Sequence, residues 1–109
     1  MTDLDPQVTE AFKALSDPVR WSIVRELAKR DELGFKTLEE LLPLSKSAVS
    51  YHARILTQAG LLTVRKQGRN YFYALRKELV RELVGQLHAL APADRRGRPA
   101  PLKGLRPAR

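Results

Sequence analysis

The first third of the chain places its apolar residues with the period of amphipathic helices. We predict two helices, over residues 6–15 and 18–30, because Ser16-Asp17-Pro18 between them supplies capping side chains and a proline suited to a first helical position. Their apolar stripes recur every three or four residues, at Val8, Ala11, Phe12 and Leu15 and then at Val19, Ile23, Val24, Leu27 and Ala28. Trp21, beside the second stripe, is expected in the core.

Two further helices, separated by a short turn, follow in the pattern. Thr37-Leu38-Glu39-Glu40 has the spacing of a capping box, which predicts a short helix that Pro43 closes. Residues 45–60 then predict a longer helix, with Ser45 as N-cap and Gly60 as a left-handed stop. One side of this helix is apolar and is expected to be buried, at Ala48, Val49, Ile55, Leu56 and Ala59. The opposite side is polar, at Lys46, Ser47, Ser50, Tyr51 and Arg54.

After Gly60 the period changes from that of a helix to that of a strand. Alternation over residues 62–67 and the aromatic, β-prone residues 70–75 predict two strands. Gly68-Arg69 between them fits a two-residue type II′ turn with glycine first. The predicted fold is therefore mainly α with a β-hairpin wing (α+β), a winged helix-turn-helix in the order αααα-β-β-α.

The C-terminal third divides into a helix and a tail. Residues 77–90 return to helical spacing, with a stripe that is wider than one small domain needs, at Leu79, Val80, Leu83, Val84, Leu87 and Leu90. We expect this helix and the one over residues 6–15 to form a dimer surface. Residues 91–109 are rich in Pro, Gly, Ala and Arg, which predicts a disordered basic tail behind a domain of residues 1–90.

Composition narrows the possible functions of the chain. Its 109 residues include 43% hydrophobic ones, enough for one small core, and no cysteine, so disulfide and thiolate chemistry is excluded. The N-terminal residues lack the apolar run of a secretory signal, and no stretch is long and apolar enough to cross a membrane. We expect a cytoplasmic protein with no membrane partner.

The net charge of +8 is unevenly distributed along the chain. Residues 1–42 carry a net −3, whereas residues 43–76 carry six cations and no acid, and residues 91–109 carry a net +5. The acid-free segment contains both the helix over residues 45–60 and the wing. Double-stranded DNA is therefore the expected partner.

The candidate DNA-binding residues lie on the polar side of that helix and on the hairpin. We predict base or phosphate contacts from Ser45, Lys46, Ser47, Ser50, Tyr51, His52 and Arg54 of the helix and from Arg65, Lys66, Arg69 and Asn70 of the wing. The alternatives are an ordinary solvated helix face and edge strands whose cations only prevent aggregation. The basic tail could add phosphate contacts or only reflect composition.

These stretches resemble the ArsR/SmtB family of bacterial winged-helix regulators over roughly residues 8–90. The matching pieces are residues 12–20 with Ile23-Val24 and Leu27, residues 44–52, Leu56 with Ala59-Gly60-Leu61-Leu62, and Gly68-Arg69 with Tyr73. The resemblance implies a homodimer that binds an operator and in most members represses transcription. It also implies an interface of the first and last helices, here Val8, Phe12, Leu79, Val80, Leu83 and Leu87.

The metal sites that the resemblance would imply lack their ligands in this chain. The positions of the family's thiolate sensors hold Gly34 and Lys36, and those of its zinc sensors hold Lys77, Leu79, Leu90 and Ala93. His52 matches a histidine common in the family's recognition helix, so it is assigned to packing or phosphate contact. No metal or cofactor is predicted. The cysteine-free composition is similar to that of a nickel-linked member, which implies a nickel response through a separate effector-sensing protein or a weak site.

The sequence supports two hypotheses about function. The first is a sequence-specific transcriptional regulator, a repressor or an activator, that binds an inverted-repeat operator as a dimer. The second is a basic winged-helix interaction module for a protein or RNA partner. An enzyme is not expected, because no nucleophile–histidine–acid pattern and no glycine-rich phosphate loop occurs.

Overall fold

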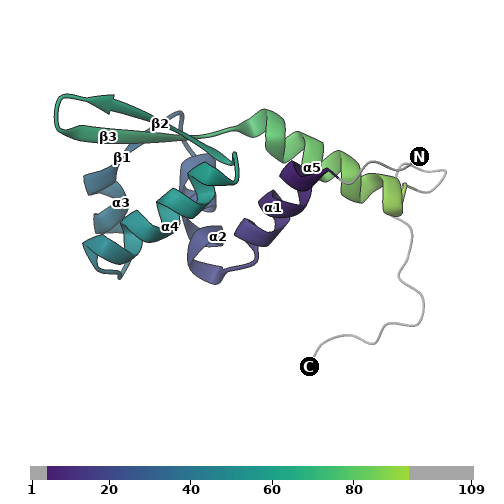
Figure 1. Ribbon diagram of the computed structural model, residues 1–109, viewed down its shortest axis with the longest axis horizontal. Coiled ribbons are helices and arrows are strands. Elements are labelled where there is room, and N and C mark those ends of the chain that lie inside the picture. Colours follow the sequence, from purple (N-terminus) through teal and green to yellow (C-terminus); the bar gives the residue numbers. More distant parts are fainter. Residues whose placement is uncertain (1–4, 94–109) are drawn as a thin grey trace.

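A computed structural model describes residues 5–93 of the chain. Within that range five helices and a three-stranded antiparallel sheet follow one another as α1 (Pro6–Leu15), α2 (Pro18–Ala28), β1 (Leu33–Gly34), α3 (Phe35–Leu41), α4 (Lys46–Gln58), β2 (Leu62–Gln67), β3 (Asn70–Leu75) and α5 (Lys77–Leu90). Figure 1 shows α1 to α4 gathered in one body, with the β2–β3 hairpin projecting from one side and α5 extending past α1 on the other. The predicted tail falls, from residue 94 onward, outside the described residues.

Both N-terminal helices begin as the sequence predicts. Asp5 caps α1, and Asp17 caps α2 by accepting from the backbone N–H groups of Val19 and Arg20, with a proline after each cap. These carboxylates satisfy amide groups that have no partner inside the helix. The predicted span of α1 is confirmed, whereas α2 ends at Ala28, two residues before its predicted end.

The predicted start of α3 is wrong, and so is the absence of a strand before it. Leu33 and Gly34 form the short strand β1, which pairs with Tyr73 and Phe72 of β3. The chain therefore passes directly from strand to helix at Gly34, and no side chain caps α3. Thr37 lies inside the helix and cannot form the predicted capping box. The element order accordingly contains three strands rather than two.

The ends of α4 are those that the sequence predicts. The Oγ of Ser45 accepts from the backbone N–H of Ala48 at 3.1 Å. At the other end Gly60 has a φ of 84°, and the N–H of Leu61 donates to the carbonyl of Leu56 at 3.0 Å. This is a Schellman ending, which needs the left-handed conformation that glycine adopts without strain.

The wing is a regular hairpin. β2 pairs with β3 in antiparallel register from Leu62 opposite Leu75 to Gln67 opposite Asn70, so the predicted two-residue turn is confirmed. Gly68 alone in this turn has a positive φ, 62°, as a type II′ turn requires of its first central residue. β3 lies between β1 and β2, so the base of the wing is attached to the helical body.

The core gathers under α4. Its residues Val49, Ala53 and Leu56 are fully buried, and Val49 and Leu56 join a cluster with residues of α1, α2, α3 and α5. The buried stripe thus centres on Ala53, and the predicted members Ala48, Ile55 and Ala59 are only partly buried.

The expectation that Trp21 is in the core is wrong. Its side chain is 50% exposed, because the buried side of α2 is made by Ile23, Val24 and Leu27. Among residues 5–93 no helix combines the length and the apolar character needed to span a bilayer.

Candidate nucleic-acid interface

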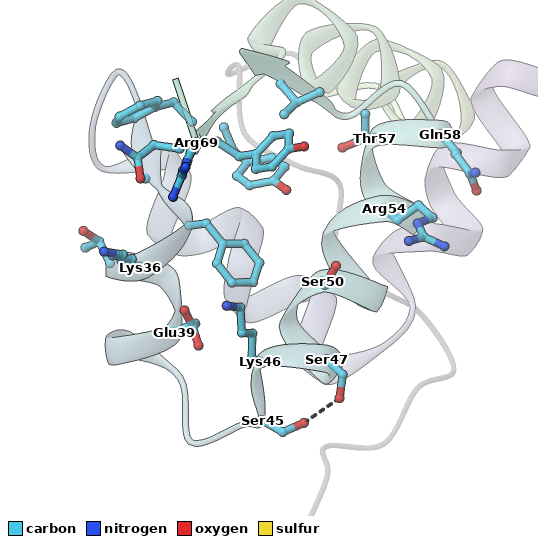
Figure 2. A pocket seen from close by; sticks show the side chains of 18 residues that line it. Lys36, Glu39, Ser45, Lys46, Ser47, Ser50, Arg54, Thr57, Gln58 and Arg69 are labelled. Carbon is cyan, nitrogen blue, oxygen red and sulfur yellow. Dashed lines mark hydrogen bonds between the residues drawn. The ribbon is translucent and has the colours of Figure 1, made fainter. Parts of the chain in front are cut away.

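A groove of about 1220 Å³ lies between α3, α4 and the wing (Figure 2). Figure 2 shows Ser47, Ser50, Arg54 and Gln58 along the α4 side, with Lys36 and Arg69 across from them. Helices and hairpin thus present polar side chains from two directions to one concave surface, here called the basic groove. Its lining consists of Gly34, Phe35, Lys36, Thr37, Glu39, Ser45, Lys46, Ser47, Ser50, Arg54, Thr57, Gln58, Val64, Arg69, Asn70, Tyr71, Phe72 and Tyr73.

Five of the seven helix residues predicted from the sequence line this groove. Lys46, Ser47 and Arg54 are exposed, and Ser50 is half-buried among them. Ser45 also lines the groove, but its Oγ is used as the helix cap and lies 3.4 Å from that of Ser47. Short hydroxyls between two long cations allow a close approach to a polyanion.

The other two predicted helix residues lie elsewhere. Tyr51 is 58% exposed but does not line the basic groove. His52 is mostly buried, with its side chain 15% exposed, and its ring meets that of Tyr51 edge to face. The Nδ1 atom of His52 lies 3.4 Å from Nη1 of Arg20 and 3.8 Å from Oδ2 of Asp17. His52 therefore faces α2.

Some predicted wing residues line the basic groove, and others contact neighbouring side chains of the wing. Arg69 and Asn70 line the groove at the tip of the hairpin. Lys66 lies over the ring of its cross-strand neighbour Tyr71, with Nζ 5.7 Å from the ring centroid. Arg69 is thus the wing cation that the groove itself presents to a ligand.

Arg65 is held by a neighbouring acid. Its Nε and Nη2 atoms donate to the two carboxylate oxygens of Glu32 at 3.0 and 2.7 Å, and its guanidinium lies 4.6 Å from the ring centroid of Phe72. The hydrogen bonds from Arg65 lower the pKa of Glu32, and the same pair raises the pKa of Arg65. Arg65 therefore connects the wing to the loop before β1, and its predicted DNA contact stays a prediction.

Several groove residues are absent from the sequence-based prediction. Lys36 of α3 faces the groove, as do Thr57 and Gln58 at the end of α4. The signal that could have found Thr57 and Gln58 is helical spacing from Ser47, Ser50 and Arg54. Lys36 gives no such signal, since its position depends on how α3 packs beside the wing.

Aromatic residues form the floor and wing side of the groove. Tyr71 is 44% exposed, whereas Tyr73 packs partly against the core, where burial and then the proximity of Tyr71 raise its pKa.

The charged residues of the groove are mostly basic. Four cations, Lys36, Lys46, Arg54 and Arg69, line the groove with one acid, Glu39. The surface thus has a positive bias suited to a phosphate backbone.

The residues predicted for a dimer interface divide between the core and the surface. Val8, Leu79 and Leu83 are buried where α1 packs on α5, and Phe12 and Val80 pack partly against the same core. Leu87 is 53% exposed, and Val84 and Leu90 beside it are exposed as well. The part of α5 still available to a second chain is its C-terminal half.

The described residues contain no group of three or more His, Cys, Asp and Glu side chains placed to hold a metal ion. Of the positions aligned with sensor sites, Gly34 lies in β1 and Lys36 in the groove. The predictions about metal response stay predictions.

A helix-turn-helix completed by a β-hairpin defines a winged helix-turn-helix protein, and comparisons with known proteins agree. A family profile described as "Helix-turn-helix domain" matches residues 15–65. The arsenical resistance operon repressor of Bacillus subtilis is 35% identical over 77 residues, covering 71% of this chain and 73% of that protein. A transcriptional repressor SmtB homolog of Synechocystis is 40% identical over 85 residues, covering 78% of this chain but only 64% of that protein.

A solved structure shows the same architecture. The ArsR-like transcriptional regulator from Rhodococcus sp. RHA1 matches with a TM-score of 0.69 at 30% identity, covering 77% of this chain and 78% of that one. The chain belongs to the ArsR/SmtB family of winged helix-turn-helix regulators. This family is made up of transcriptional regulators and not of enzymes.

Proposed function

We propose that this protein is a sequence-specific DNA-binding transcriptional regulator whose helix α4 enters the major groove. The observation that carries the proposal is the basic groove, in which cations from α3, α4 and the wing converge. An α-helix fits the width of the B-DNA major groove, and the wing then lies beside the neighbouring minor groove. The phosphate strand between these two DNA grooves would pass along the basic groove.

Different side chains are proposed to contact bases, phosphates and the minor groove. Lys46 and Arg54 can donate to guanine O6 and N7, and the hydroxyls of Ser47 and Ser50 can meet base edges or phosphates. Arg69, at the tip of the wing, can enter a minor groove. Lys36 adds a phosphate contact from α3.

A homodimer and an inverted-repeat operator complete the proposal. Two half-sites one helical turn apart would match the symmetry of two copies of α4. Support comes from the apolar C-terminal half of α5, where Val84, Leu87 and Leu90 are exposed. Repression is the proposed direction of regulation, since two relatives are named as repressors.

The regulatory signal is proposed to arrive through a separate effector-sensing protein. This is supported by the residues at the family's sensor positions, among them Gly34 and Lys36, which cannot ligate soft metals. A nickel link for that signal stays a prediction.

The test is a comparison of two duplexes. Affinity for a random duplex and for the gene's own upstream region is measured at two salt concentrations. A specific regulator prefers the upstream region at both concentrations. Equal affinity for the two duplexes, or none for either, would instead favour a basic module that serves a protein or RNA partner.

A further inference from the structure

Arg20, at the start of α2, joins three segments of the chain beside the imidazole of His52. Asp17 caps α2, with its Oδ2 accepting from the backbone N–H groups of Val19 and Arg20 at 2.9 and 3.0 Å. The Nε of Arg20 donates to the carbonyl oxygen of Ala14, in the last turn of α1, at 2.7 Å. The Nη1 of the same guanidinium lies 3.4 Å from Nδ1 of His52. Arg20 thus connects the end of α1, the start of α2 and the middle of α4.

The chemistry of this contact selects the tautomer of His52 that fits it. A guanidinium has only donors and stays charged, so the Nδ1 atom that faces Arg20 must accept. The tautomer that fits this contact carries its proton on Nε2. The side chain is only 15% exposed, so water competes weakly for the contact.

We propose that Asp17 and Arg20 are positioning residues that act through His52 to set the orientation of α4. Arg20 holds the ring, and Asp17 fixes Arg20 by accepting from its backbone N–H. Ser47, Ser50 and Arg54 of the basic groove stand on the same helix, so a rotation of α4 about its axis displaces all of them together. The inference rests on the proposed DNA-binding function, and it replaces a DNA contact by His52 with a role inside the protein.

Protonation of His52 would disturb this arrangement. Among the described residues, the charged groups facing the ring are Arg20 and Asp17, and the phenol of Tyr51 meets its edge. A proton on Nδ1 removes the acceptor and sets two cations against each other, while the carboxylate of Asp17 attracts the ring away from Arg20. DNA affinity is therefore expected to fall on acidification. A histidine bound to phosphate would show the opposite, since its protonated form binds an anion more tightly.

The test measures affinity for a duplex selected by the wild-type protein from random DNA, from about pH 8 to about pH 6 at constant ionic strength. Affinity of the wild type should fall about three- to tenfold as the pH is lowered through this range. His52→Gln keeps an acceptor oxygen that does not titrate, so it should bind within about threefold of the wild type and lose this pH dependence.

Two variants break the contact and one leaves it intact. His52→Leu and Arg20→Lys should each weaken binding about tenfold, because leucine cannot accept and a lysine ammonium cannot reach both Ala14 and His52 in fork geometry. The matched control is His88→Gln, which removes the other histidine of the chain and should retain the wild-type pH profile.

Other outcomes would overturn the inference. These are a wild-type affinity that rises on acidification with the rise lost in His52→Gln, or unchanged affinity in both Arg20→Lys and His52→Leu. Nitrogen-15 NMR of the free wild-type protein tests the same geometry without DNA, and a ring protonated at Nδ1 near neutral pH would contradict it. If the wild type selects no duplex, the proposed function fails while the NMR result still decides the role of His52.

Discussion

At the scale of single residues, exposure alone does not decide which cations line the basic groove. Arg54 and Arg65 are both exposed arginines of the acid-free segment, and the sequence predicts both as DNA contacts. Arg54 lines the basic groove, whereas Arg65 is bound in bidentate fashion by Glu32, 33 residues earlier in the chain. Helical spacing could predict the position of Arg54. The pairing of Arg65 with Glu32 is a long-range contact, which local patterns do not contain.

Lys36 is the groove cation that the sequence does not reveal, and its removal tests the path of the DNA strand. Lys36→Gln should make the negative slope of log affinity against log salt shallower by about 0.9. It should also weaken binding to specific and random duplexes alike. The control is Lys29→Gln, whose side chain pairs with Glu26 outside the groove and should leave the slope unchanged. Equal slopes in Lys36→Gln and the wild type would place the DNA strand elsewhere.

At the scale of secondary-structure elements, end signals predicted most of the fold. Ser45, Asp17 and Gly60 mark their helix ends in the structure as in the sequence, because each acts on amide or carbonyl groups within a few residues. The strand β1 has only two residues and exists through its pairing with Tyr73 and Phe72, so no local pattern announces it. Because β1 runs directly into α3, the helix starts at Phe35, before Thr37, and the predicted capping box does not form.

The Arg65–Glu32 pair attaches the wing to the helical body, and this attachment should depend on pH. Hydrogen bonds from Arg65 lower the pKa of Glu32 below its ordinary value of 4.5. The stabilisation is therefore complete above that value and is lost as the pH falls through the folded-state pKa. Both side chains are substantially exposed, which keeps the effect modest.

The measurement is the free energy of unfolding between about pH 5 and about pH 3. The wild type should lose stability more steeply over this interval than Glu32→Gln does. Glu40→Gln, which changes an exposed carboxylate of α3, is the control and should follow the wild type. Parallel curves for the wild type and Glu32→Gln would show that the pair does not stabilise the fold.

At the scale of the whole molecule, α3, α4 and the wing, which line the basic groove, lie at one end, and α5 extends to the other (Figure 1). The sequence predicts one wide apolar stripe on α5, but the structure divides it. Leu79 and Leu83 are buried within the chain, whereas Val84, Leu87 and Leu90 are exposed. The period of the stripe could not show this division, because the division depends on which residues of α5 pack against the core of the chain.

Dimer formation can be tested on that remaining patch. Val84→Glu combined with Leu87→Glu should convert a dimer to a monomer, since two charges would be buried in an apolar contact. Sedimentation velocity gives the oligomeric state. The control is Leu41→Glu, which changes an exposed leucine on α3, far from α5 along the chain. A double variant that sediments like a wild-type dimer would place the interface elsewhere.

The most direct test of sequence reading by α4 is the ratio of affinities for a selected and a random duplex, in the wild type and in Arg54→Ala. If Arg54 reads a base, the variant loses about 1–3 kcal/mol on the selected duplex and less on the random one, so the ratio falls. Arg81→Ala, an exposed cation of α5, should keep the wild-type ratio. A ratio unchanged by Arg54→Ala would contradict base reading by this residue, and a wild type that binds both duplexes equally would contradict sequence-specific regulation.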